Sequence, residues 1–294
     1  MSKKQSISQQ KQRLAYLMTL PTFLLIFIFI TFPVLYNIWL SFRHITLGNL
    51  NQKTPWVGLA NYLKVLKDLE FYNALKTSLI YSIGGSGVTV LLGLVAALIL
   101  NQTFRGRKLI RATFLFTYIA PLVSLAFIWK WIFNPVYGVG NWILKETGII
   151  SQSIPWFSQA PYALIMIILF EGWRYFPFAM LLILARLQAI PQELYDAASI
   201  DGARKWHTFF YITFPEIKFV LGVAFLLRMI WAFHKFDDIF LLTSGASGTK
   251  VLSILIYEYS FSLQKLGLGA AASLILFLLM LTFLIFYLKK VLKW

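Results

Sequence analysis

Long runs of apolar residues alternate with short polar connections along nearly the whole chain. Each run reaches the roughly 20 residues that an α-helix needs to cross the hydrocarbon core of a bilayer. Six such runs lie at about 14–40, 71–100, 110–133, 161–190, 218–240 and 266–288. The pattern predicts an all-α membrane protein with six transmembrane helices, the first of them retained because no small-residue cleavage site follows it.

The polar segments outside these runs define the expected domain organisation. We expect a cytoplasmic N-terminal tail at residues 1–13, a membrane domain at 14–290 and a cytoplasmic C-terminus at 291–294. The second apolar run also contains four glycines, which permit close packing of membrane helices as readily as they mark a function. These are Gly84, Gly85, Gly87 and Gly93.

Composition agrees with a membrane protein, since 59% of the residues are hydrophobic and only 13% are charged. The net charge of +16 does not indicate a nucleic-acid partner, because Lys and Arg lie in short stretches between apolar runs. The chain has no cysteine, and His44, His207 and His234 lie far apart in sequence. We therefore expect neither a metal site nor catalytic residues.

The distribution of Lys and Arg predicts the orientation of the helices. One alternating set of segments, which includes both termini, holds 15 Lys and Arg, whereas the opposite set holds nine. The more basic set is expected on the cytoplasmic side. This predicts a multi-pass membrane protein with both termini in the cytoplasm.

The connection between the fourth and fifth runs has a pattern of its own, IPQELYDAASIDGARKWHTFFYITFPEIK, from Ile190 to Lys218. It predicts a short amphipathic helix at about 192–200 and a sharp turn at Gly202. A second short helix is expected at about 204–212, ending before Pro215. The result would be a cytoplasmic helix-turn-helix, although a segment of this kind can also be an amphipathic helix that lies passively on the membrane.

This segment resembles the EAA loop of ABC importer permeases, with Asp196 at the position where the family usually has Glu. The resemblance rests on Asp-Ala-Ala at 196–198, Asp-Gly-Ala at 201–203, and then Phe209, Ile212 and Phe214-Pro215. It implies that the loop, at about 191–217, couples the permease to a cytoplasmic ATPase subunit. The implied coupling residues are Glu193, Asp196, Ala197, Ala198, Asp201, Gly202 and Ala203.

Three further stretches are similar to the carbohydrate-uptake branch of type I importers, which includes maltose and glycerol-phosphate permeases. They are WVGLANY, FHKFDDIFLLTSGASG and VLSILIYEYSF, where Ala246 and Ser247 depart from the usual Thr-x-Gly-Gly-Pro. The family assembly contains a second homologous permease subunit, two ATPase subunits and an extracytoplasmic solute-binding protein. Since this sequence has no G-x-x-x-x-G-K-[ST], ATP and magnesium are expected on the partner ATPase subunits, and this chain is not expected to be an enzyme.

Charged residues inside the predicted spans suggest where the solute passes, because a charge in a bilayer is costly. Glu171 and Arg174 are three residues apart in the fourth span, and Arg228 and Lys235 are seven apart in the fifth, so each pair shares one helix face. The predicted pathway residues are Glu171, Arg174, Tyr175, Phe178, Arg228, Ala232 and Lys235. The alternative is a structural ion pair of Glu171 with Arg174 or Arg228, with Lys235 extending to the outer interface.

The function predicted from these observations is half of the translocation pathway of an ATP-driven importer for a sugar or oligosaccharide. The excess of basic groups over the single acidic group in the spans hints at an acidic saccharide. Import of glycerol-phosphate or another phosphorylated polyol is an alternative. A secondary transporter, which would show inverted repeats and broken helices, and a membrane scaffold without transport are others.

Overall fold

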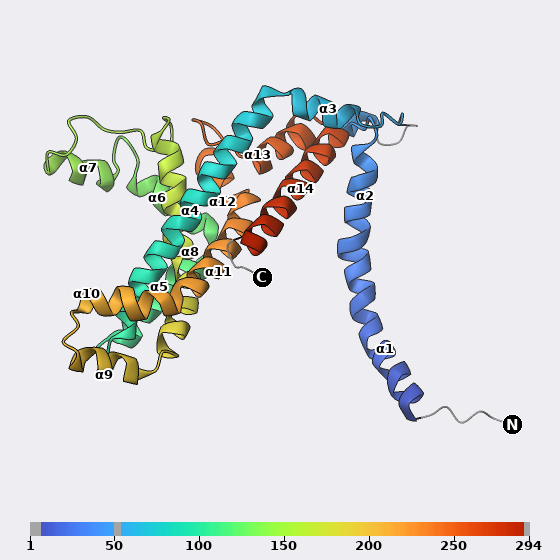
Figure 1. Ribbon diagram of the computed structural model, residues 1–294. Helices are drawn as coiled ribbons and strands as arrows, with labels where there is room; N and C mark the ends of the chain where they lie inside the picture. Colours follow the sequence, from blue (N-terminus) through green and yellow to red (C-terminus); the bar gives the residue numbers. More distant parts are fainter. Residues whose placement is uncertain (1–6, 50–53, 291–294) are drawn as a thin grey trace. The chain divides into compact units, whose positions relative to one another are not determined.

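The computed structural model describes residues 7–49 and 54–290, and it places them in helices and connections (Figure 1). The chain divides into two compact units, residues 1–67 with 256–275 and residues 68–255 with 276–294. The predicted C-terminus at 291–294 and the first six residues of the predicted tail lie outside the described residues.

Five helices are long and apolar enough to cross a membrane, and one bent pair of helices would make a sixth span. This agrees with an all-α membrane fold. The five helices are Lys11–Ser41, Leu69–Asn101, Tyr162–Gln188, Lys205–Phe233 and Leu266–Lys289. The bent pair consists of Arg107–Ile119 and Leu122–Ile132.

The first unit begins with a long helix formed by α1 (Ile7–Ile26), the π-helical η1 (Phe27–Thr31) and α2 (Phe32–Ser41). Within the described chain, none of the most apolar 18-residue window of this helix is buried. The unit also contains three short helices and the start of a longer one. These are η2 (Leu47–Asn49), α3 (Ala60–Lys67), η4 (Glu258–Ser262) and α14 (Leu266–Lys290).

Two long helices, α4 (Leu69–Asn101) and α8 (Tyr162–Gln188), pack against each other in the second unit. Glycines make this approach possible: a Cβ added to Gly85 would lie 2.6 Å from Cγ of Glu171, and one added to Gly93 would lie 2.7 Å from Cβ of Ala179. Helix α11 (Phe214–Phe233) packs against both α4 and α8. Close packing through the glycines of the second run is thus confirmed for Gly85 and Gly93.

The third predicted span is not one straight helix. It consists of α5 (Arg107–Ile119) and α6 (Leu122–Ile132), whose axes differ by 99°. Pro121 lacks an N–H donor and disfavours helical geometry at Ala120, which is extended with φ −61° and ψ 145°. Hydropathy alone predicts a continuous run here because both halves are apolar.

The second short helix of the loop does not end before Pro215, contrary to the prediction. Helix α10 (Lys205–Thr208) continues through the π-helical η3 (Phe209–Thr213) into α11, which carries Pro215 in its first turn. The wider π turn accommodates a residue that cannot donate a backbone hydrogen bond. The same arrangement occurs where η1 precedes Pro33 at the start of α2.

The fifth predicted span ends earlier than expected. Helix α11 stops at Phe233, and a separate helix, α12 (Asp237–Thr243), begins after a short connection. Lys235 therefore lies in a connection rather than on a helix face with Arg228. The remaining helices are α7 (Val139–Glu146), α9 (Gln192–Ile200) and α13 (Leu252–Tyr257).

Candidate functional site

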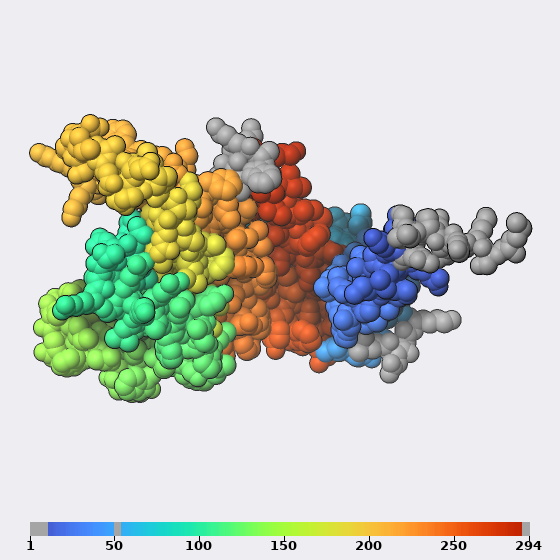
Figure 2. Space-filling model, turned by 90° about the horizontal axis from the view of Figure 1, so that it is seen from below, coloured from blue at the N-terminus to red at the C-terminus, as the bar shows by residue number. Residues whose placement is uncertain are grey.

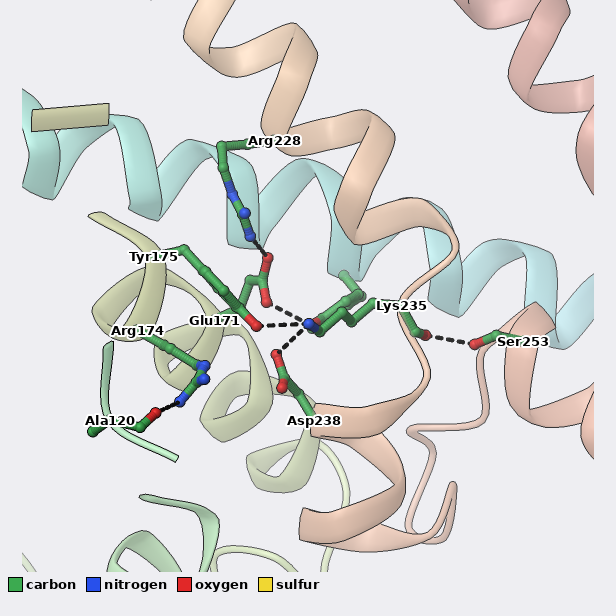
Figure 3. Close-up of polar contacts among 9 residues, drawn as sticks. Ala120, Glu171, Arg174, Tyr175, Arg228, Lys235, Asp238 and Ser253 are labelled. Carbon is green, nitrogen blue, oxygen red and sulfur yellow. Dashed lines mark hydrogen bonds and ion pairs between the residues drawn. The ribbon is translucent and has the colours of Figure 1, made fainter. Parts of the chain in front are cut away.

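A buried ion pair lies within the second unit, between Glu171 of α8 and Arg228 of α11 (Figure 3). The Glu171 side chain is fully buried, and the Arg228 side chain is 4% exposed. Glu171 also accepts a hydrogen bond from the hydroxyl of Tyr81 at 3.0 Å. A pair this deeply buried is costly to break from one side only, because the remaining charge would have no partner.

Tyr175 brings three cations together around one aromatic ring. The guanidinium carbon of Arg228 lies 4.0 Å from the ring centroid, Nζ of Lys235 lies 4.8 Å from it and the guanidinium carbon of Arg174 lies 5.4 Å from it. Nζ of Lys235 also donates a hydrogen bond to the Tyr175 hydroxyl at 2.6 Å. The Lys235 ammonium group thus points toward Tyr175.

Asp238 is a member of the cluster that the sequence analysis missed. This buried residue of α12 has Oδ2 3.6 Å from Nζ of Lys235. Its spacing could have indicated an ion pair, since Asp238 follows Lys235 by three residues. The predicted fifth span at 218–240 instead covered both residues as one continuous helix. With Asp238 included, the cluster has three basic and two acidic groups rather than three and one.

Arg174 lies near the same cluster but contacts a different part of the chain. Its Nη1 donates a hydrogen bond at 3.3 Å to the carbonyl oxygen of Ala120, at the C-terminal end of α5 where the chain bends (Figure 3). A cation at this position satisfies a carbonyl that a helix end leaves unpaired. Among the described residues, Arg174 forms no ion pair with Glu171.

The predicted pathway residues separate into two groups by exposure. Ala232 is 1% exposed and packs in an apolar cluster with Tyr81 and Phe170, and Glu171, Arg174 and Arg228 are also buried. Tyr175, Phe178 and Lys235 are partly exposed. Phe178 packs edge to face on Trp231, whose side chain is 39% exposed and which the sequence analysis did not include.

The loop between α8 and α11 forms the predicted helix and turn. Helix α9 covers residues 192–200, as expected, and Gly202 adopts a positive φ of 69°. The N–H of Ala203 bonds to the carbonyl of Ala198 at 2.9 Å, and that of Gly202 to the carbonyl of Ser199 at 3.1 Å. This is a Schellman motif, which satisfies the last carbonyls of the helix and favours glycine at its left-handed position.

Most of the predicted coupling residues lie at the exposed surface of this loop. Figure 2 shows the segment, coloured yellow to gold, projecting from the second unit. Two large apolar side chains are unusually exposed near the turn, Ile200 at 87% and Trp206 at 71%. A hollow of about 370 Å³ between α9 and α10 is lined in part by Tyr195, Ala203 and Phe209. The predicted coupling residues that are exposed are Glu193, Asp196, Ala197, Asp201, Gly202 and Ala203, whereas Ala198 is half-buried.

Two side-chain contacts attach the loop to the helices at its base. The hydroxyls of Tyr195 and Thr213 lie 3.1 Å apart and join α9 to η3. Arg186, near the end of α8, forms an ion pair with Glu216 of α11 and also donates to its backbone oxygen at 3.0 Å. The loop is therefore connected to both helices that carry the buried ion pair.

Comparison with known proteins identifies the family. Residues 89–293 match the family described as "Binding-protein-dependent transport system inner membrane component". The chain is 39% identical over 285 residues to the trehalose/maltose transport system permease protein MalF of Thermococcus litoralis, with 96% of this chain and 95% of that protein covered. It is 34% identical over 278 residues to the inner membrane ABC transporter permease protein YcjO of Escherichia coli, with 94% of each covered.

The fold also has a solved counterpart. It matches a chain in the crystal structure of a bacterial alginate ABC transporter in complex with an alginate pentasaccharide-bound periplasmic protein. The TM-score is 0.80 at 21% identity, and the match covers 97% of this chain and 98% of that one. The matched family model covers more than half of the sequence. This chain belongs to the family of binding-protein-dependent transport system inner membrane components.

Proposed function

We propose that this chain is the permease subunit of an ATP-driven importer for a sugar or oligosaccharide. The observation that carries the proposal is the 39% identity, over 96% of the chain, to a trehalose/maltose permease. The match to a chain of an alginate importer at a TM-score of 0.80 adds a second saccharide carrier of the same fold. Together these favour a saccharide over a phosphorylated polyol.

The exposed loop around α9 is the proposed contact with a cytoplasmic ATPase subunit. Ile200 and Trp206 offer apolar surface beside small residues, a combination suited to insertion into a groove of a partner. In this proposal ATP and magnesium bind to two separate ATPase subunits, and the loop and both chain termini lie in the cytoplasm of a bacterium.

Two further partners are proposed on the outside of the chain. The α1–η1–α2 helix leaves its apolar surface uncovered among the described residues, and a second homologous permease subunit together with lipid would cover it. The alginate transporter in the matched structure binds a periplasmic protein loaded with pentasaccharide. We propose that an extracytoplasmic solute-binding protein delivers the solute to this chain in the same way.

The proposed solute site has an exposed surface and a buried support. Tyr175, Phe178, Trp231 and Lys235 are partly exposed, and aromatic faces with an ammonium group suit pyranose rings and their hydroxyls. Behind them, the buried Glu171–Arg228 pair and Asp238 fix the positions of Tyr175 and Lys235. The second permease would supply the other half of the site.

The charge of this cluster does not by itself select an acidic saccharide. Asp238 reduces the excess positive charge to one, and both acidic groups are paired with basic ones.

We propose alternating access as the mechanism: ATP binding moves the loop, and the solute site opens toward the binding protein. The coupling requires that the two conformations bind solute or ATP with different affinities.

The proposal is tested by co-expressing the chain with an adjacent-gene permease, ATPase and binding protein, and then measuring co-purification and ATP hydrolysis. We expect the ATPase to co-purify and its activity to rise when neutral saccharides are added with the binding protein. Uronic-acid oligosaccharides and glycerol phosphate are the comparison solutes. Saccharide uptake that persists without any associated ATPase would instead support a secondary transporter.

A further inference from the structure

The first unit contains a small basic cavity that takes no part in the proposed solute site. Its volume is about 90 Å³, and its lining includes Arg43, His44, Lys64 and Lys265 together with Asn61 and Gly267. These residues come from three separate segments: the chain after α2, helix α3, and the residue before α14 together with the start of that helix (Figure 1). No carboxylate is among the residues that line the cavity.

The backbone around the cavity is held in place by specific contacts. The amide of Asn61 donates to the carbonyl oxygens of Ser41 and Arg43, both at 2.9 Å. The N–H of Gly267 donates to the carbonyl oxygen of Ile45 at 3.1 Å. A Cβ on Gly267 would lie 2.1 Å from the oxygen of Arg43, so only glycine permits this approach. These contacts therefore fix the positions of the segments that line the cavity.

The positive charge around the cavity is not neutralised by the described part of the chain. Within residues 7–49 and 54–290, His44, Lys64 and Lys265 form no ion pair. Arg43 donates to the backbone oxygen of Thr54 at 2.9 Å and stacks on Trp39, but its buried Nε has no partner there. Three formal cations among the residues that line one small space attract an anion.

The surroundings of the cavity indicate the source of that anion. Arg43 lies two residues beyond the end of the candidate span at Lys11–Ser41, a position that corresponds to a membrane–water interface. Leu59, just before α3, is 62% exposed, and Leu63, within α3, is 55% exposed. Lys64 and Lys67 lie in the same helix. Short amphipathic helices of this composition lie in the interface, with leucines toward acyl chains and lysines toward headgroups.

We infer that the cavity binds the phosphate group of an anionic phospholipid from the adjoining leaflet. A cavity of about 90 Å³ has room for a group the size of a phosphate. An acidic segment of the solute-binding protein would match the charge of the cavity. Such a polar segment would not bury the exposed leucines beside the cavity, whereas acyl chains would. This site would operate whatever solute the chain carries.

Native mass spectrometry of the full-length chain in detergent, titrated with phosphatidylglycerol, tests the inference. Phosphatidylcholine serves as the neutral reference. We expect Lys64→Gln/Lys265→Gln to bind phosphatidylglycerol about 30-fold more weakly, from roughly 1 kcal/mol per basic residue and about 1.4 kcal/mol per tenfold change. Lys64→Arg/Lys265→Arg keeps both charges and should retain the lipid, which separates lost charge from failure to fold.

The matched control is Lys76→Gln/Lys145→Gln, which removes two exposed lysines that do not line the cavity. It should bind phosphatidylglycerol as the unaltered chain does. An equal loss in this control, or no preference for phosphatidylglycerol over phosphatidylcholine, would overturn the inference. Unchanged lipid binding in Lys64→Gln/Lys265→Gln with weakened binding-protein association would assign the surface to that protein instead.

Discussion

The aromatic ring of Tyr175 lies 4.0 Å from the guanidinium carbon of Arg228, while its hydroxyl accepts a hydrogen bond from Lys235 at 2.6 Å. One side chain thus links a buried cation to a partly exposed one. Each of these two interactions involves a different part of the tyrosine, so substitutions can separate them.

Tyr175→Phe removes the hydroxyl and keeps the ring, whereas Tyr175→Ala removes both. A hydrogen bond to a charged group contributes about 1.5–3 kcal/mol and a desolvated cation–π contact about 2 kcal/mol. We expect Tyr175→Phe to lower saccharide uptake by about tenfold and Tyr175→Ala to lower it considerably further. Initial uptake rates in cells, normalised to the amount of chain in the membrane, provide the measurement. Equal uptake by all three proteins would remove Tyr175 from the solute site.

Glu171→Gln should destabilise the chain by about 3–5 kcal/mol, because it leaves Arg228 buried without a counter-ion. The double variant Glu171→Gln/Arg228→Met removes the unpaired charge and should regain much of that loss. Thermal unfolding in detergent, followed by the fluorescence of a thiol-independent dye or by circular dichroism, compares the two. If the double variant is no more stable than Glu171→Gln alone, Glu171 does not stabilise the chain by neutralising Arg228.

Gly202 should tolerate asparagine but not valine. Its φ of 69° is a left-handed conformation that asparagine adopts at low cost and a β-branched residue does not. We expect Gly202→Val to reduce co-purification of the ATPase about tenfold, consistent with roughly 1–2 kcal/mol of backbone strain. Gly202→Asn should stay near the unaltered level. A steric clash does not explain the expected difference between valine and asparagine, since no atom lies within 4 Å of a Cβ at this position.

Gly85→Ala should disturb the buried ion pair, because the added methyl group would lie 2.6 Å from Cγ of Glu171. Overpacking of this kind costs about 1–3 kcal/mol, and we expect a lower unfolding temperature. Gly87→Ala is the matched control, since a Cβ there meets no atom within 4 Å in the same helix. A similar effect of both substitutions would point to the general properties of glycine in α4 rather than to Glu171.

The parts of the structure that local signals determine could be predicted from the sequence. Helix α9 has its expected bounds because Pro191 lies just before its first residue and Gly202 permits the turn that ends it. The apolar runs likewise locate the membrane helices, since length and hydropathy are the requirements for crossing a bilayer.

The parts that depend on tertiary contacts could not be predicted in this way. Arg174 donates to the carbonyl of Ala120, 54 positions away, and this partner depends on a bend that hydropathy does not register. Asp238 joins the cluster only because α11 ends at Phe233 and a new helix begins. The choice of Arg228 rather than Arg174 as the partner of Glu171 depends equally on how α11 packs against α8.

The π turn at Phe209–Thr213 keeps one helical rod unbroken from Lys205 to Phe233. Arg228 lies 20 residues beyond Thr208, so at 1.5 Å per residue the rod extends about 30 Å from the loop to the ion pair. Tilting such a rod by about 5° around its loop end displaces Arg228 by about 2–3 Å, which is enough to separate a guanidinium from a carboxylate. Had Pro215 broken the helix, a hinge would stand between the loop and Arg228, and the same tilt would be absorbed before reaching it.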